Sequence, residues 1–117
     1  MRAIAAAVVF LLLPAVAWAQ AHPLLTSPPM GGVVASAQEV RITFSEAVRG
    51  GASGIRVLTA RDQPLPTPFA RVERANPRVL VLRLGRRLPP GGYEVQWWAV
   101  TVNDVRTQGG YSFTIRP

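Results

Sequence analysis

Short runs in which apolar and polar residues alternate are the feature that most limits how this chain can fold. Between residues 39 and 44, Val40, Ile42 and Phe44 alternate with polar residues, and residues 111–115 repeat the pattern. Successive side chains of a strand point to opposite faces, so this period of two predicts strands with one buried face. No stretch beyond the first twenty residues has the apolar spacing of an amphipathic helix. We therefore expect an all-β protein.

Five further segments have the length and composition of strands, and turn-forming residues separate them. They are residues 24–27 as an edge strand, 55–59, 69–72 as a weaker strand, 79–82 as a central strand with two buried faces, and 93–102 as the longest strand. Eleven prolines and ten glycines punctuate the chain, notably in the turn at residues 88–92 and the polar break at residues 103–109. Six or seven short strands without intervening helices predict a single antiparallel β-sandwich and exclude a parallel α/β sheet.

The amino-terminal end has the pattern of a secretory leader. Arg2 is followed by an apolar run over residues 4–13, and small residues stand at the cleavage positions of two sites, ending at Ala19 and Ala21. The run is shorter than the roughly 20 residues that span a membrane. We expect a signal peptide over residues 1–21 that is removed on export.

Cleavage after Ala21 leaves one small domain over residues 22–117, with no segment that would insert into a membrane. The chain has no cysteine, so export brings no disulfides and stability must come from a hydrophobic core. About a hundred residues are enough to build such a core.

The charge of the chain is strongly basic, with 13 arginines, no lysine and 6 acidic residues. The arginines are scattered along the sequence, and no helix or stripe concentrates them as nucleic-acid-binding proteins do. We therefore interpret them as a solvated basic surface and expect no nucleic-acid partner.

Catalytic arrangements find no support in the sequence. There is no cysteine, and the single histidine, His22, is followed by Pro23 near a terminus, so no Ser-His or Cys-His pair has a plausible scaffold. No spacing singles out a pair of carboxylates, and no glycine-rich run joins a strand to a helix. We expect a protein that is not an enzyme.

His22 stands where cleavage makes it a metal ligand. Cleavage after Ala21 exposes an α-amine and an imidazole on the same residue, while Pro23 has no amide proton and blocks further chelation along the backbone. Cleavage after Ala19 instead puts His22 third from a free amine, the arrangement that holds Cu(II) or Ni(II) in a square plane. Both products suit Cu(II), which favours tetragonal sites of nitrogen and oxygen ligands. The alternative is an incidental histidine on a mobile terminus.

Four segments of the mature chain, in the same order and spacing, are similar to those of a known family. They are residues 22–32, 40–48, 88–97 and 109–115. In these segments the chain resembles the CopC/PcoC family of periplasmic copper-resistance proteins. The resemblance implies a Greek-key β-barrel or sandwich of cupredoxin-like or immunoglobulin-like form, and a periplasmic location.

The resemblance also implies a Cu(II) site built from the first histidine, a glutamate and an Asp-x-His pair in the loop before the last strand. The histidine corresponds to His22 and the glutamate to Glu46. The Asp-x-His pair falls on Asn103 and Val105, so its imidazole is missing, and Asp104 is a neighbouring carboxylate that a shift of one residue would bring in. The implied metal residues are therefore His22, Glu46, Asp104 and Asn103, with weaker copper binding than the complete ligand set provides.

Two features reduce the match further. Arg106 could pair with Asp104 and compete with a metal ion, and Met30 is the only methionine outside the leader, so the methionine-rich Cu(I) segment of some members is absent. An enzyme that uses a histidine brace for copper would need a second histidine, which the chain lacks.

The sequence therefore predicts a periplasmic copper-binding protein for copper resistance or homeostasis, a carrier or chaperone, whose partner is an inner-membrane copper transporter. The alternative is a degenerate CopC-like domain that has lost its metal and acts as an interaction module, through Trp97, Trp98 and the basic surface.

Overall fold

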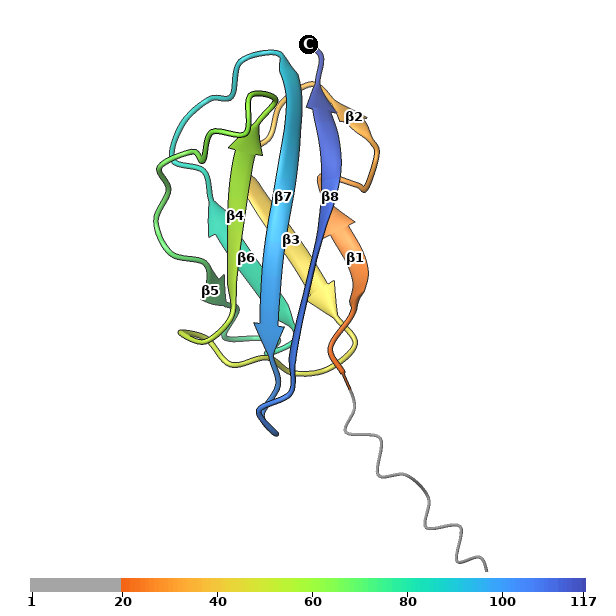
Figure 1. Ribbon diagram of the computed structural model, residues 1–117, viewed down its shortest axis with the longest axis vertical. Coiled ribbons are helices and arrows are strands. Elements are labelled where there is room, and N and C mark those ends of the chain that lie inside the picture. Colours follow the sequence, from red (N-terminus) through yellow and green to blue (C-terminus); the bar gives the residue numbers. More distant parts are fainter. Residues whose placement is uncertain (1–19) are drawn as a thin grey trace, which may run out of the picture.

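The computed structural model describes residues 20–117, which form two four-stranded sheets packed face to face (Figure 1). The strands are β1 (Pro23–Ser27), β2 (Val33–Val34), β3 (Glu39–Phe44), β4 (Gly54–Thr59), β5 (Arg71–Val72), β6 (Val79–Arg83), β7 (Gly91–Val100) and β8 (Arg106–Ile115). The predicted leader lies outside the described residues except for Gln20 and Ala21. Within the described part, no helix is long and apolar enough to cross a membrane.

One sheet has the strand order β1-β3-β6-β5 and the other the order β2-β8-β7-β4. The chain crosses from one sheet to the other after β1, β2, β3, β4 and β6, and only β5–β6 and β7–β8 are consecutive strands within one sheet. All paired strands are antiparallel except β2 and β8, which are parallel at Val33 and Thr114. The predicted all-β sandwich is confirmed, with β1 at an edge and β6 inside its sheet.

The strand bounds differ from the prediction mainly near the carboxyl end. Strand β7 ends at Val100, and β8 begins at Arg106, so residues 106–109 are paired with β7 although the sequence predicted a polar break there. Backbone hydrogen bonds to a long neighbouring strand do not require apolar side chains, which is why period alone missed this pairing. The weak strand predicted over residues 69–72 is reduced to β5, and β2 was not predicted.

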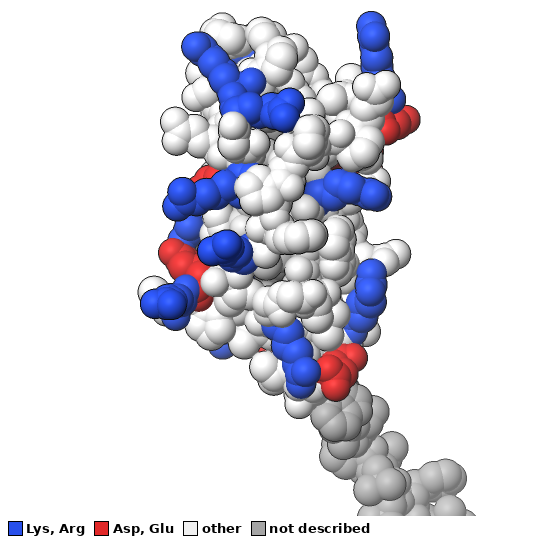
Figure 2. Space-filling model, turned by 90° about the vertical axis from the view of Figure 1, so that its left-hand side faces the viewer, with Lys and Arg blue, Asp and Glu red and all other residues white. Residues whose placement is uncertain are grey.

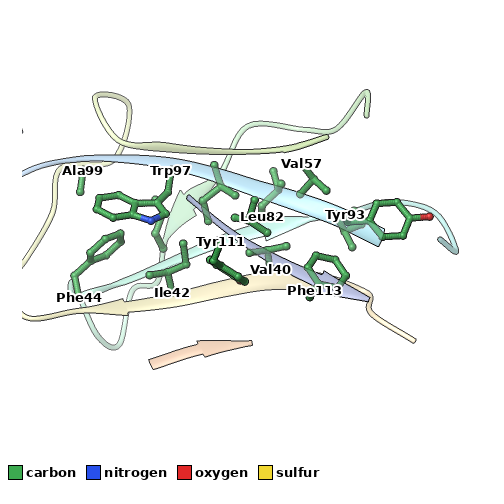
Figure 3. Packing of buried hydrophobic residues seen from close by; sticks show 14 of the residues in the cluster. Val40, Ile42, Phe44, Val57, Leu82, Tyr93, Trp97, Ala99, Tyr111 and Phe113 are labelled. Carbon is green, nitrogen blue, oxygen red and sulfur yellow. The ribbon is translucent and has the colours of Figure 1, made fainter. Parts of the chain in front are cut away.

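The core lies between the sheets and is built by the alternation seen in the sequence. Val40, Ile42 and Phe44 of β3 are completely buried. Phe44 meets Trp97 of β7 edge to face, with ring centroids 5.3 Å apart (Figure 3). Gly109 of β8 lies opposite Trp97, and a Cβ atom there would stand 2.6 Å from the indole, so the absence of a side chain makes room for the ring.

The arginines are distributed over the surface of the sandwich. Figure 2 shows them spread over the face in view, with few acidic neighbours and no continuous stripe. Among the described residues, Arg41 is paired with Glu73 and lies 3.8 Å from Glu39. The structure thus matches the scattered arrangement expected from the sequence.

Candidate metal centre

The residues named as metal ligands all lie at one end of the sandwich, where β1 begins, β3 ends and the β7–β8 hairpin turns (Figure 1). Pairing of β1 with β3 sets Pro23 opposite Phe44, which brings the preceding His22 beside the following Ser45. The amide of Ser45 donates a hydrogen bond of 2.8 Å to the His22 carbonyl. The position of His22 is therefore fixed by the sheet, although its side chain is exposed.

Ser45 also contacts the two nitrogens of His22 that the sequence indicates as candidate metal ligands. The backbone nitrogen of His22 donates to Ser45 Oγ at 3.1 Å, and the same oxygen lies 3.1 Å from Nδ1 of the imidazole. Both nitrogens thus face one point, because the ring is turned so that Nδ1 is on the side of its own main-chain nitrogen. Chelation of a metal ion by the amine and the imidazole of one histidine needs this orientation.

The two residues before His22 pack against the sandwich. Ala21 is completely buried and belongs to the core cluster. Its carbonyl accepts a hydrogen bond of 2.6 Å from Thr107 Oγ1 of β8, and the Gln20 carbonyl accepts one of 3.3 Å from Ser45 Oγ. The end of the predicted leader therefore occupies part of the candidate site while it remains attached.

The turn between β7 and β8 is closed by Thr101, whose carbonyl accepts from the Asp104 amide at 2.9 Å. Its hydroxyl accepts from the Val105 amide at 3.2 Å. Asp104 has φ of 63°, in the left-handed region that aspartate tolerates better than most residues. This backbone conformation decides where the Asp104 carboxylate points.

The Asp104 carboxylate is paired with Arg49, not with Arg106 as the sequence suggested. Arg49 Nη1 lies 3.4 Å from Asp104 Oδ1, and Nη2 donates to the Val102 carbonyl at 2.7 Å. Arg106 is opposite Val100 in the sheet and lines a trough of about 600 Å³ on the outer face of β4, β7 and β8, beside Trp98. Strand β8 already includes Arg106, so its backbone directs it away from the turn.

The structure brings the predicted ligands to the same end but not into one cluster. Within residues 20–117, no group of three or more His, Cys, Asp or Glu side chains is close enough to hold a metal ion. Glu46 is half-buried beyond the end of β3, and Asn103 and Asp104 are exposed on the turn. The close neighbours of the site that the sequence did not indicate are Ser45, Arg49 and Thr107. Only Ser45 had a signal, its place between Phe44 and Glu46 in a motif already noted.

The family model for the CopC domain matches residues 24–116. The chain belongs to the CopC family. Among curated proteins, it is 31% identical over 100 residues to Protein YobA of Escherichia coli strain K12, covering 85% of this chain and 81% of that protein. It is 29% identical over 106 residues to Copper resistance protein C of Escherichia coli, covering 84% of each. It is 27% identical over 104 residues to Copper transport protein CutJ of Bacillus subtilis, covering 88% of this chain but 19% of that protein.

Solved structures of the CopC domain have the same fold. CopC from Methylosinus trichosporium OB3b superposes with a TM-score of 0.78 at 25% identity, covering 84% of this chain and 95% of that one. PcoC, a methionine-rich copper resistance protein from Escherichia coli, superposes with a TM-score of 0.73 at 26% identity, covering 84% and 100%. These matches confirm the resemblance found in the sequence. Unlike a methionine-rich protein, this chain has only Met30 within the described residues.

Proposed function

We propose that this CopC-family protein is a periplasmic copper-binding protein that holds Cu(II) through its mature amino-terminal histidine. Its function would be copper resistance or homeostasis, as a carrier or chaperone and not as an enzyme. Family membership and the copper-related names of two relatives support the metal. The sequence of the leader supports export.

The observation that carries the proposal is the orientation of His22. Its main-chain nitrogen and Nδ1 both lie 3.1 Å from a single oxygen, Ser45 Oγ, and therefore face the same point. After cleavage following Ala21 the main-chain nitrogen becomes an amine, and the two nitrogens form a chelate of the kind that Cu(II) accepts in tetragonal sites. Water or carboxylate oxygens complete the coordination.

Glu46 and Asp104 remain the proposed source of carboxylate oxygens, with Asn103 as a further loop contributor. For both carboxylates to bind the same ion as His22, at least one of Glu46 and Asp104 would have to move, since the three residues form no cluster in the described part of the chain. Val105 supplies no imidazole. Copper binding by this site should therefore be weaker than in relatives with the complete ligand set.

The proposed partner is an inner-membrane copper transporter. The match with Copper transport protein CutJ supports this partner. The matched segment makes up 19% of that protein, so a segment similar to this chain occurs there within a larger protein whose name assigns it to copper transport. The candidate site is at the exposed end of the sandwich, where a transporter can reach a bound ion without unfolding the domain.

A second candidate is a CopC-like interaction module without metal. It is favoured by the absence of a three-ligand cluster among residues 20–117 and by the trough beside Trp98, Arg56 and Arg106. This function would leave the domain fold intact while the copper ligands are lost.

Titration with Cu(II) separates the two functions. The protein is exported without an affinity tag, its first residue is identified by intact mass, and the mature form is titrated beside His22→Ala. Copper binding predicts a visible d–d band and an electron paramagnetic resonance spectrum with nitrogen couplings, both lost in His22→Ala. An exchange of one surface polar group, Ser112→Ala, serves as the matched control. A wild-type protein without a d–d band, or a band that His22→Ala retains, would contradict the copper function.

A further inference from the structure

We propose that Ser45 is a positioning residue that holds His22 in its metal-binding tautomer and orientation, and that removal of the leader completes this role. The inference rests on the proposed function of His22 and adds a residue that is not itself one of the predicted metal ligands. It begins from one hydroxyl group with three polar neighbours: His22 N at 3.1 Å, His22 Nδ1 at 3.1 Å and the Gln20 carbonyl at 3.3 Å.

The hydroxyl group can accept two hydrogen bonds but has only one proton to donate. The main-chain N–H of His22 is a donor, so it uses a lone pair of Ser45 Oγ. The Gln20 carbonyl and Nδ1 are both acceptors when the ring is neutral and protonated on Nε2. They therefore compete for the same proton as long as Gln20 is attached.

Cleavage after Ala21 removes Gln20 and with it the competing carbonyl. The Ser45 proton is then donated to Nδ1 alone, which favours the tautomer with its proton on Nε2 and a lone pair on Nδ1. The new amine continues to donate to Ser45 Oγ. One proteolytic step thus creates the amine ligand and directs the Ser45 hydroxyl to the other ligand atom.

Ser45 can act in this way because its own position is rigid. It follows Phe44, which is completely buried and packs against Trp97. Its amide also donates to the His22 carbonyl at 2.8 Å. A polar group that is held by a strand and a buried aromatic ring orients its neighbour more strictly than a group on a free loop.

When copper binds, the metal replaces the hydroxyl proton at Nδ1. The coordinated amine retains N–H bonds and continues to donate to Ser45 Oγ. Neighbours that orient a ligand in this manner typically change metal affinity by about 10- to 100-fold when they are removed. Ser45 is therefore expected to tune the site without contributing one of its nitrogen ligands.

The test compares mature chains that begin at His22 and carry Ser45→Ala, Ser45→Thr or the control Ser112→Ala. Ser45→Ala deletes the hydroxyl but keeps the hydrogen bond from the residue 45 amide to the His22 carbonyl. We expect its Cu(II) affinity to fall about tenfold with the nitrogen couplings retained. In the metal-free protein, nitrogen NMR of the imidazole should show an increased fraction of the Nδ1–H tautomer. Ser45→Thr keeps a hydroxyl and should restore both properties.

A chain that begins at Gln20 gives a second, metal-free measurement. Its imidazole should have a larger Nδ1–H fraction than the chain beginning at His22, since the Gln20 carbonyl again takes the Ser45 proton. Unchanged tautomer populations in both Ser45→Ala and the longer chain would overturn the inference. Loss of copper in His22→Ala together with wild-type affinity and tautomers in Ser45→Ala would also overturn it, while the proposed function would stand. If His22→Ala still binds copper normally, the proposed function fails, and the metal-free spectra alone decide the role of Ser45.

Discussion

Arg49 and Asp104 form an ion pair between two parts of the chain that are far apart in sequence. Arg49 Nη1 lies 3.4 Å from Asp104 Oδ1. Arg49 follows β3, whereas Asp104 is in the turn between β7 and β8. The same guanidinium donates to the Val102 carbonyl, and the Arg49 amide donates to the Val100 carbonyl at 2.8 Å. One residue thus holds the turn that carries Asn103 and Asp104, the proposed loop ligands of the candidate site.

Arg49→Gln should loosen this turn and release the Asp104 carboxylate. The side chain of Arg49 is 49% exposed and that of Asp104 is 74% exposed. We therefore expect a loss of at most about 1 kcal/mol in the free energy of unfolding. The loss should shrink at high salt, because solvent-exposed ion pairs are screened. Urea unfolding at low and high ionic strength measures it, with the exposed Arg61→Gln as control. An equal loss of unfolding free energy in Arg49→Gln and Arg61→Gln would contradict a special role of Arg49. If Asp104 is a copper ligand, Arg49→Gln should also bind Cu(II) more tightly, because the carboxylate is no longer paired.

Val105→His should restore the imidazole that the CopC resemblance assigns to this position. We expect an additional nitrogen coupling in the electron paramagnetic resonance spectrum of the copper form. Affinity for Cu(II) should rise about tenfold, equivalent to about 1.4 kcal/mol. Val102→His is the matched control, because Val102 is 59% exposed on the same turn. If Val102→His raised the Cu(II) affinity as much as Val105→His, the family alignment of this turn would be wrong.

Gly109→Ala should destabilise the domain, since its Cβ atom would lie 2.6 Å from the Trp97 indole. The ring cannot move freely, as it is buried and packs on Phe44. We expect a loss of about 1–3 kcal/mol, the usual cost of overpacking a core. Gly92→Ala in β7 is the control, because nothing lies within 4 Å of the added atom. Urea unfolding followed by tryptophan fluorescence gives both values, and similar stabilities would mean that the indole repacks without cost.

Tyr111 should make the stability of the domain depend on pH under alkaline conditions. Burial raises the pKa of Tyr111 from 10.0 to about 12, and the Thr26 side chain has a smaller, opposite effect. The folded state keeps the phenol proton to a higher pH than the unfolded state does. The corresponding contribution to stability is therefore fully present below about pH 10 and is lost as the pH rises from about 10 to about 12. Tyr111→Phe should flatten the fall in stability over that range, as measured by unfolding at a series of pH values.

The comparison with Tyr93→Phe separates the effect of the proton from that of a hydrogen bond. The Tyr111 hydroxyl has no partner of ordinary hydrogen-bond geometry among the described residues, so its removal should change stability little at pH 7. The Tyr93 hydroxyl donates to the Pro89 carbonyl at 2.6 Å, so Tyr93→Phe should cost about 1 kcal/mol there. A larger loss in Tyr111→Phe than in Tyr93→Phe at pH 7 would show that Tyr111 has a partner in solution.

The strands with a buried face were predictable because apolar side chains at alternate positions mark the face that is buried. In β3 the alternation of Val40, Ile42 and Phe44 gave the correct bounds and the correct inward face. The first five residues of β8 were missed, since Arg106 and the residues after it are polar or glycine and are held by pairing with β7. Such pairing depends on the neighbouring strand and leaves no local signal.

The candidate site shows the same division. His22 is predicted as a metal ligand from its position at a predicted cleavage site, which is a property of the sequence. The sequence alone also determined the absence of cysteine, the predicted export signal, the all-β class and the missing imidazole at Val105. Only the tertiary structure decided that Ser45 contacts both His22 nitrogens and that Asp104 pairs with Arg49 and not with Arg106. Those contacts join residues more than twenty positions apart, and hydrogen bonds act over about 3 Å, so they exist only once the strands are paired in register.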